Sequence, residues 1–536
     1  MVLSDNWESV FWKIWWRISL FFAIVKQAAP SYFLCADWER GAPKDLGDEE
    51  AALHKNVCRK ISQQARATER GSRIMVNEDK RIKIMRDAPP LQAIFTMSIP
   101  VILGMMVNVV YNLVDTWFIG LMGDELQLAA SSLSTPVFVL IMAVASLIGT
   151  GGASYLSRSL GAGRKEQAEK TIATAILLIC LFGIFVAAAG IIFRNQIPDI
   201  LGASELSFKY TLQYAITLMI GGIFIIGNFV LGQLIRAEGS TKLSMIGMMV
   251  GTVANIILDP LFIFTFGWGI TGAAIATVIG NGLSALFFLA CYVRKKTFLS
   301  LTFRKFTLDF AIFKEIFAIG IPVTAGQMLV SVAQMILNNL ASGYGDTTVA
   351  ALGIALRIMT IGTFIFMGFS AGCQPLMGYN YGSGNYMRMK EFIKTGIMAT
   401  SLIGLGLLLA MGLFAPFLVA AFTPLEEVRT SGTTILRALI LSLPFMGGTT
   451  LCSTTFQAMG KPMKAFILTI SRQGLLYVPL LFLLNHLFGW NGMVYSQPIA
   501  DFVMLLIASS VLFKVLHGLR EDSGKEGESK PPNLRR

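Results

Sequence analysis

Twelve long apolar runs occupy the chain from residue 93 onward, and they limit what it can fold into more than any other feature. A helix that crosses a bilayer needs about 20 apolar residues. Only 14% of the residues are charged and the mean hydropathy is +0.63, whereas soluble domains carry about 25% charged residues. We therefore expect an all-α integral membrane protein with twelve transmembrane helices. The expected spans are 93–121, 133–157, 168–193, 208–235, 241–266, 270–293, 315–342, 348–377, 392–421, 431–456, 463–487 and 491–516.

The loops between these spans differ in charge. The net charge is +12, and basic residues such as Arg164, Lys295 and Lys390 gather in the even-numbered loops and the C-terminal tail. The odd-numbered loops are mainly acidic, with Asp199 and Glu427 among their residues. Because positive loops stay in the cytoplasm, we expect a multi-pass protein of the cell inner (plasma) membrane with both termini cytoplasmic. The basic groups follow the topology and form no single patch, which argues against nucleic-acid binding.

The first 74 residues do not match the rest of the chain. Residues 10–27 are apolar and aromatic but contain basic side chains, so they form neither a clean span nor a signal peptide. They are either an interfacial amphipathic anchor or an upstream extension that does not fold, and we favour the second interpretation. Met75 opens a short basic lead into the first span and could be the natural start.

A repeat with an offset near 221 relates the two halves of the apolar region. Ile99–Val101 recurs as Ile321–Val323, and Gly104 recurs as Gly326. Parallel repeats are typical of transporters, in which two similar bundles enclose the substrate site. We therefore expect two pseudo-symmetric six-helix bundles around a central cleft. The predicted domains are a poorly ordered N-terminal extension (1–88), an N-terminal bundle with a cation site (89–300), a C-terminal bundle (301–518) and a polar cytoplasmic tail (519–536).

A proline lies inside the first expected span. Pro100 removes a backbone donor and should kink the helix, and Gly104 follows one turn later. The kink is either a static bend that fits the bundle or a moving hinge, and the sequence leaves both open.

Three polar residues, Asp115, Asp259 and Thr277, lie in apolar runs where a charge or hydroxyl is costly. The alternating topology and the rise of about 1.5 Å per residue bring all three to the same depth, roughly 9–12 Å below the outer surface. Asn255 precedes Asp259 by four residues and so shares its helical face. These side chains supply oxygen ligands that suit a hard cation such as sodium. A buried carboxylate pair also takes up a proton readily, so a proton could load the same site.

Three strings carry a family resemblance: SIPVILGMMVNVVYNLVDTWFIG, ANIILDPLFIFTFGWGITGAAIAT and GFSAGCQPLMGYNYGSG. With them, residues 85–518 resemble the multidrug and toxic compound extrusion (MATE) transporters, in particular the bacterial DinF/MepA-like branch. In that branch a proline-kinked first helix carries an aspartate fifteen residues on, as Pro100 and Asp115 do here. An Asn-x-x-x-Asp pair on the fifth helix and a threonine eighteen residues later complete a sodium- or proton-binding cluster, matched by Asn255, Asp259 and Thr277.

The resemblance implies an antiporter that exports amphipathic organic cations and drugs by alternating access, coupled to sodium or protons, and it adds Asn228 as a further polar member of the cluster. The implied partners are these compounds, the coupling ions and membrane lipids. No cofactor is expected beyond a bound sodium ion, and the chain is expected to be a monomer. The sequence contains no Walker motif and no catalytic or Cys/His metal grouping, so neither ATP-driven transport nor an enzyme is expected.

One intramembrane acid falls outside this pattern. Asp501 in the last span either binds a substrate amine or pairs with Arg472 or Arg357, and pairing is the favoured interpretation. The NorM-type branch keeps acids on its seventh and tenth helices, where this chain has Gln327 and Arg437. The intramembrane arginines keep a second function open, a flippase for lipid-linked oligosaccharide precursors with the same two-bundle fold.

Overall fold

The structure, a computed structural model, describes residues 80–299 and 309–528, and the secondary structure in these residues is helical. The first half contains α3 (Pro90–Leu121), α4 (Glu125–Leu133), α5 (Thr135–Gly161), α6 (Lys165–Ile192), α7 (Gln196–Ile200), α8 (Phe208–Ile220), α9 (Gly222–Ala237), α10 (Thr241–Pro260), the π-helical turn η1 (Leu261–Thr265) and α11 (Gly269–Val293). The second half contains α12 (Phe310–Ser342), α13 (Asp346–Gly382), α14 (Tyr386–Ala420), α15 (Glu426–Leu439), the short 3₁₀ turn η3 (Ile440–Ser442), α16 (Leu443–Ala458), α17 (Pro462–Ile470), the π-helical η4 (Ser471–Tyr477) and α18 (Val478–Glu528).

The helices match the expected spans. In the described part of the chain, ten helical stretches are long and apolar enough to cross a membrane, or eleven when the α8–α9 pair, bent by 48°, counts as one span. One stretch, Pro462–Gly518, is 57 residues long and so has the length of two spans. Gly489 interrupts it with φ 58° and ψ −140°, between the two spans expected there. The all-α membrane fold is confirmed, and division at Gly489 gives the twelve spans.

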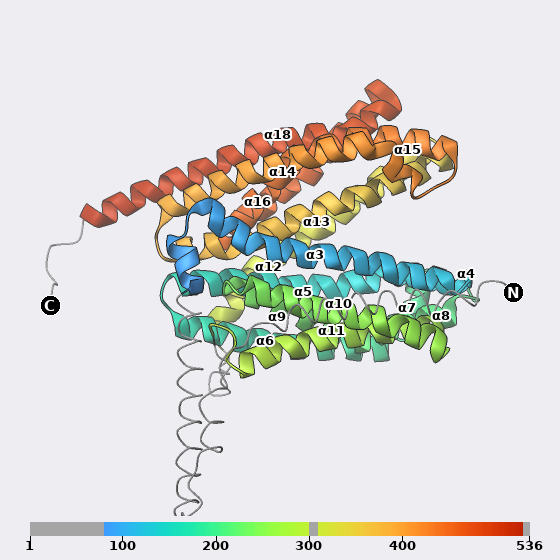
Figure 1. Cartoon of the computed structure of the whole chain (residues 1–536), viewed down its shortest axis with the longest axis horizontal. Helices are drawn as coiled ribbons and strands as arrows, with labels where there is room; N and C mark the ends of the chain where they lie inside the picture. The colour runs from blue at the N-terminus through green and yellow to red at the C-terminus, as the bar shows by residue number, and fades with distance from the viewer. Residues whose placement is uncertain (1–79, 300–308, 529–536) are drawn as a thin grey trace, which may run out of the picture. The chain divides into compact units, whose positions relative to one another are not determined.

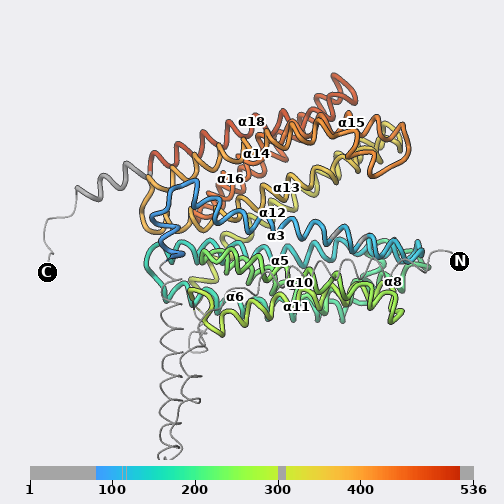
Figure 2. Tube along the Cα trace, viewed as in Figure 1, coloured from blue at the N-terminus to red at the C-terminus, as the bar shows by residue number. Residues whose placement is uncertain are grey.

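Within residues 80–528 the two halves occupy separate parts of the bundle. Figures 1 and 2 show α4–α11 together on one side and α13–α18 on the other, with α3 between them. The halves also repeat a local contact. A Cβ on Gly104 would lie 3.2 Å from the sulfur of Met248, and a Cβ on Gly326 would lie 3.1 Å from Cγ2 of Thr469, the residue 221 positions after Met248.

Several polar contacts between the halves lie in the parts of the spans that the charge pattern places toward the cytoplasm. The Ser98 hydroxyl donates to the Phe369 carbonyl (3.0 Å), and Arg158 on α5 pairs with Glu315 on α12 (3.0 Å). Backbones approach closely there as well. A Cβ on Gly151 would lie 2.2 Å from the Ile316 carbonyl oxygen, so only glycine permits this contact.

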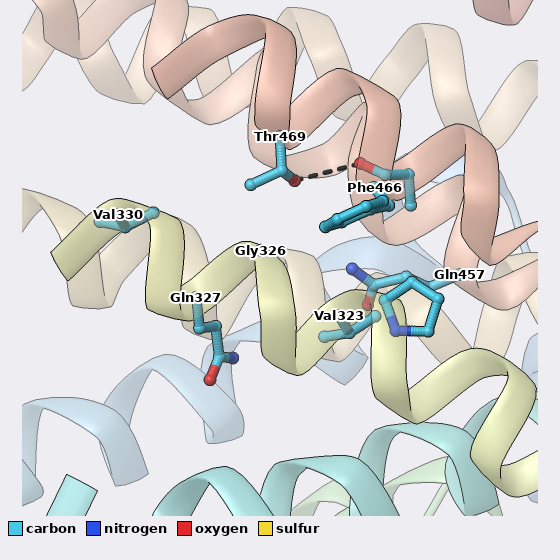
Figure 3. Close-up of a pocket in the computed structure, with 9 residues that line it drawn as sticks. Val323, Gly326, Gln327, Val330, Gln457, Phe466 and Thr469 are labelled. Carbon is cyan, nitrogen blue, oxygen red and sulfur yellow. Dashed lines mark hydrogen bonds between the residues drawn. The ribbon is translucent and has the colours of Figure 1, made fainter. Parts of the chain in front are cut away.

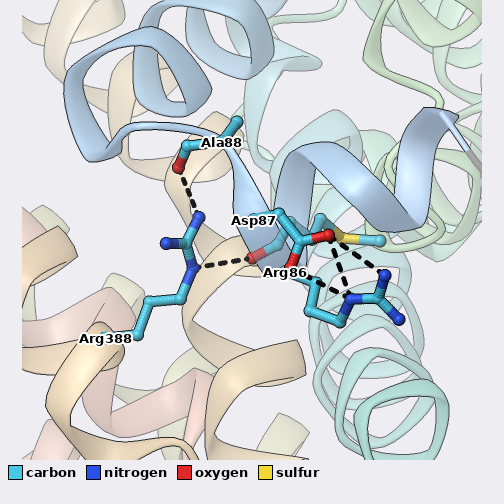
Figure 4. A network of polar contacts seen from close by, with 5 residues as sticks. Arg86, Asp87, Ala88 and Arg388 are labelled. Atoms are coloured by element: carbon cyan, nitrogen blue, oxygen red, sulfur yellow. Dashed lines mark hydrogen bonds and ion pairs between the residues drawn. The ribbon is translucent and has the colours of Figure 1, made fainter.

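The residues before α3 are also fixed to the second half. Arg388 at the start of α14 donates to the carbonyls of Met85 and Ala88 (Figure 4). The Asn380 amide also donates to the Met85 carbonyl (3.1 Å). Residues 80–87 form a helix, and Met85 packs in the core with 1% of its surface exposed. The bundle therefore begins before residue 89, where the sequence placed its first boundary. Residues 1–79, including the expected anchor or extension and Met75, lie outside the described residues.

A buried acid lies between α9 and α10. Glu238 is 1% exposed, and one of its carboxylate oxygens accepts a hydrogen bond from the Leu299 amide (3.2 Å). Burial raises the pKa of Glu238 to about 7, although the Tyr292 hydroxyl and the Leu299 amide act in the opposite direction. Because Leu299 directly precedes the segment that joins the halves, Glu238 holds the end of the first bundle.

The raised pKa of Glu238 predicts a pH-dependent stability. Above the unfolded value, near 4.5, the buried carboxyl resists ionisation, so its contribution to the free energy of unfolding falls as pH rises toward 7. The full loss is about 3 kcal/mol at 1.36 kcal/mol per pKa unit. Glu238→Gln keeps an acceptor for Leu299 and should therefore melt above the wild type at pH 8 and close to it at pH 4.5. Thermal melting in detergent at both pH values tests this, and an equal offset at the two would refute it.

Candidate functional site

Three helices of the first half bring the predicted polar residues together. Asp115 on α3, Asp259 on α10 and Thr277 on α11 lie in one cluster, in which the Tyr111 hydroxyl hydrogen-bonds the Thr277 hydroxyl (3.2 Å). The carboxylates of Asp115 and Asp259 are close enough to interact electrostatically with each other and with Tyr111. Asp259 is 0% exposed, and Asn255 and Thr277 are also buried. The predicted convergence of these side chains is therefore present in the fold.

Helical spacing explains why these residues meet. Asn255 and Asp259 are four residues apart on α10, as are Tyr111 and Asp115 on α3, and such pairs project from one face. Pro260 directly follows Asp259, and the chain continues as the π-helical turn η1. A π-helical turn widens the helix locally and is frequent at functional sites.

An apolar cluster lies next to these residues, on the side that the charge pattern predicts to face outward. It contains Ile119, Ile263, Ile270 and Ala273. Ile119 and Ile263 follow Asp115 and Asp259 by four residues, about one helical turn, and Ala273 precedes Thr277 by four residues on α11. The apolar cluster is thus displaced from the polar cluster by about 6 Å along the helices, at 1.5 Å rise per residue.

Asn228 lies next to the cluster and reaches it through a relay. Its amide donates to Asn281 (2.8 Å), and the Asn281 amide donates to the backbone carbonyl of Thr277 (2.8 Å). Asn228 therefore acts on the Thr277 turn of α11 through Asn281, which bonds the Thr277 backbone carbonyl. Among the predicted members it is the most peripheral.

Several buried polar atoms in the cluster have no hydrogen-bond partner among the described residues. They are one carboxylate oxygen of Asp115, both of Asp259, and the amide oxygen and nitrogen of Asn255. Buried polar atoms are nearly always paired, because an unpaired one costs about 1–3 kcal/mol, and more when it is charged. Three carboxylate oxygens and an amide oxygen together are the ligand set that a hard cation prefers. The residues present therefore fit a sodium ion, and a shared proton fits them as well.

The described residues contain no group of three or more His, Cys, Asp or Glu side chains that could hold a metal ion. A cation in this cluster would therefore use two carboxylates together with neutral oxygens. That composition suits a weakly held monovalent ion better than a structural transition metal, which prefers nitrogen and sulfur ligands.

Three members of the cluster were not predicted from the sequence. Tyr111 and Asn281 carry a usable signal, since each lies four residues from a predicted member on the same helix. Tyr214 on α8 interacts electrostatically with both aspartates but has no spacing relation to them in the sequence. Only the packing of α8 against α11 brings it there.

Asp501 lies apart from this cluster. It is 0% exposed, and its carboxylate accepts from Arg472 (2.7 Å) and from the Gln497 amide (3.1 Å). Arg357 and Arg437 are exposed. The geometry favours the pairing of Asp501 with Arg472 over contact with a substrate amine. Pro100 is buried inside α3, which continues as one helix through it.

The sequence is similar to known proteins over both halves of the repeat. The MatE family model matches residues 100–261 and 322–483, so each half of the repeat is matched once. Multidrug export protein MepA of Staphylococcus aureus (strain MSSA476) is 31% identical over 448 residues, which is 84% of this chain and 99% of the relative. The protein of the same name from Staphylococcus haemolyticus (strain JCSC1435) is 32% identical over 445 residues, 83% of this chain and 98% of the relative.

A solved structure has the same fold. It is described as the outward-facing conformation of a multidrug resistance MATE family transporter of the MOP superfamily. It superposes with a TM-score of 0.79 at 28% identity and covers 82% of this chain and 99% of its own. The similarity thus extends over both bundles.

Proposed function

The chain belongs to the MATE family of transporters, and we propose that it exports amphipathic organic cations and drugs in exchange for sodium ions or protons. The names of the Staphylococcus relatives support the class of exported compound. The single observation that carries the coupling proposal is the group of unpaired oxygens of Asp115, Asp259 and Asn255 buried in one cluster.

The cluster suggests how coupling proceeds. Two carboxylates held apart from water repel each other, and a cation or proton between them removes much of that cost. A loaded cluster carries one negative charge fewer than an unloaded one and therefore tolerates closure around it better, whereas an unloaded cluster favours access to water. Tyr111 and Thr277 are positioned to follow this change, since their hydroxyls share one hydrogen bond beside the carboxylates.

Alternating access is the proposed conformational cycle. Besides the ion pair of Arg158 and Glu315, the contacts that hold the halves together include single neutral hydrogen bonds, such as Ser98 with Phe369 and Gln327 with Ser146 (3.3 Å). Each is worth about 1 kcal/mol, so they can be exchanged for similar contacts at the other end of the spans. The similarity to a solved structure that is described as outward-facing supports an outward-facing state as one end of this cycle.

One of the three intramembrane arginines that favour the flippase alternative, Arg472, is not free to bind a substrate. A flippase for pyrophosphate-linked lipids needs basic side chains free in its cleft, but Arg472 is paired with the buried Asp501. The acidic cluster of the first half is also suited to cations. We therefore keep export as the proposed function.

Efflux from energised vesicles tests the proposal. Vesicles that contain the protein should release a fluorescent organic cation when either a sodium gradient or a proton gradient is imposed, and the effective gradient identifies the coupling ion. Vesicles without the protein provide the control. Release that is equal with and without both gradients would refute cation-coupled export.

The cytoplasmic position of both termini remains a prediction, based on the charges of the loops. A membrane-impermeant thiol reagent added outside intact cells should label Asp346→Cys, which begins α13, and should not label Ser383→Cys, which follows α13. Both positions are exposed, so a difference reports the side of the membrane. A background in which the exposed Cys180 is replaced by serine keeps the signal specific. The reverse labelling pattern would invert the topology.

A further inference from the structure

A pocket of about 120 Å³ lies between α12, α16 and α17 in the second half. Val323 and Gly326 of α12 form one wall, and Gln457 of α16 with Phe466 and Thr469 of α17 form the other (Figure 3). The figure shows the Phe466 ring and the Gln457 amide on the side of α12 that faces α17. The Thr469 hydroxyl donates to the Ala465 carbonyl (3.1 Å).

The pocket lies beside the contact between the two halves. Gln327, one residue beyond Gly326, points away from Phe466 in Figure 3, and its amide donates to the Ser146 hydroxyl of α5 (3.3 Å). Thr324 donates to the Ala143 carbonyl of the same helix (3.3 Å). A molecule held in the pocket would therefore touch α12, the helix that hydrogen-bonds α5 of the first half.

The internal repeat shows why this pocket is open. At the equivalent place in the first half, the long side chain of Met248 lies against Gly104, and Arg236 reaches the sulfur of Met248 (3.7 Å). In the second half, the shorter Thr469 replaces Met248, and Gln457 replaces Arg236 with the same offset of 221. The first half thus fills this space with its own side chains, whereas the shorter side chains of the second half leave the space open as a pocket.

We propose that the pocket formed by Val323, Gly326, Gln457, Phe466 and Thr469 binds one flat aromatic ring of the exported compound. Gly326 presents a wall without a side chain, and the Phe466 ring can pack against an aromatic ring from the other wall. The Gln457 amide can both donate to and accept from a polar atom at the ring edge. This inference rests on the proposed export function and specifies the substrate class.

The size of the pocket limits what it can hold. Sites for whole drug-sized molecules measure about 300–1,000 Å³, so 120 Å³ has room for one ring while the remainder of the molecule lies outside. No charged side chain lines it, and the positive charge of a substrate would therefore be recognised elsewhere. A lipid acyl chain is the competing occupant, but it makes no use of the Gln457 amide.

Thr469→Met tests this inference, because it places at this position the residue that fills the first half. Ethidium serves as a flat aromatic cation and tetraethylammonium as a cation without a ring. We expect the transport efficiency for ethidium to fall about tenfold and that for tetraethylammonium to stay within about twofold. Ile467→Met is the matched control, since Ile467 lies on the same helix, is exposed and does not line the pocket. Equal loss for both cations, or no loss for either, would overturn the proposal.

Binding to the purified full chain separates this inference from the export proposal. Fluorescence anisotropy of ethidium should show a dissociation constant about tenfold higher for Thr469→Met and also higher for Phe466→Leu, whether or not the wild type transports. If the wild type bound ethidium but showed no efflux, the export proposal would be refuted and the assignment of the pocket would stand. Unchanged ethidium binding in both variants, as expected for a pocket occupied by lipid, would refute the pocket assignment.

Discussion

Export driven by an ion gradient should fall about a hundredfold in Asp115→Asn and in Asp259→Asn. Each change keeps the size of the side chain and removes a negative charge that makes a cation favourable inside the membrane. A charged group at such a site is worth about 3 kcal/mol on insertion scales, and that energy corresponds to roughly a hundredfold change in an equilibrium. One oxygen of Asp115 and both oxygens of Asp259 already lack a hydrogen-bond partner among the described residues, and an Asn side chain can still donate and accept hydrogen bonds, so folding should survive.

The measurement is gradient-dependent efflux at matched membrane expression. Thr277→Ala should be milder, with about a tenfold rise in the cation concentration needed, because it removes one neutral oxygen and the hydrogen bond to Tyr111. Asp199→Asn makes the same chemical change on the short helix α7, outside the cluster, and should export like the wild type. Wild-type rate and gradient dependence in both cluster variants would mean that Asp115 and Asp259 serve only the fold.

The sequence could predict that these residues meet, because topology and helical rise together place them at a similar distance from the span ends. Asp115, Asp259 and Thr277 each lie a similar number of residues from an outer span end, and no tertiary information is needed for that estimate. Helical spacing could also have revealed Tyr111 and Asn281. Tyr214 could not be found in this way, because its distance to the aspartates depends on how α8 packs against α11.

The span boundaries show a second limit. Apolar runs located the helices, but they do not report helix breaks that depend on backbone geometry. The Gly221–Gly222 junction bends α8 against α9 by 48°, where Val278 of α11 would lie 2.2 Å from a Cβ on Gly221. Likewise, residues 80–88 were assigned to the extension on composition, whereas Arg388 and Asn380 hold them to the bundle through backbone carbonyls. Contacts made through the backbone leave little trace in residue type.

The ion pair of Arg472 and Asp501 provides the second large expected effect. In the first half, the residues 221 positions earlier are Gly251 and Gly280, and a Cβ on Gly251 would lie 2.5 Å from the Gly280 carbonyl oxygen. The same helix–helix contact is thus made by two backbones in one bundle and by a buried salt bridge in the other. This equivalence indicates that the pair joins helices in the second bundle.

Arg472→Met should destabilise the protein by about 3–5 kcal/mol, because it leaves the carboxylate of Asp501 buried without its charge partner. Asp501→Asn should cost less, since Arg472 retains 18% exposure and can keep part of its hydration. The double variant Arg472→Met/Asp501→Asn should recover most of the stability, because no charge then remains buried. Thermal melting in detergent measures all three, and additive losses in the double variant would contradict the pairing. The double variant also separates the two interpretations of Asp501. If the pair is structural, restored stability should bring restored export, whereas an acid that binds substrate amines would leave a stable protein that no longer transports them.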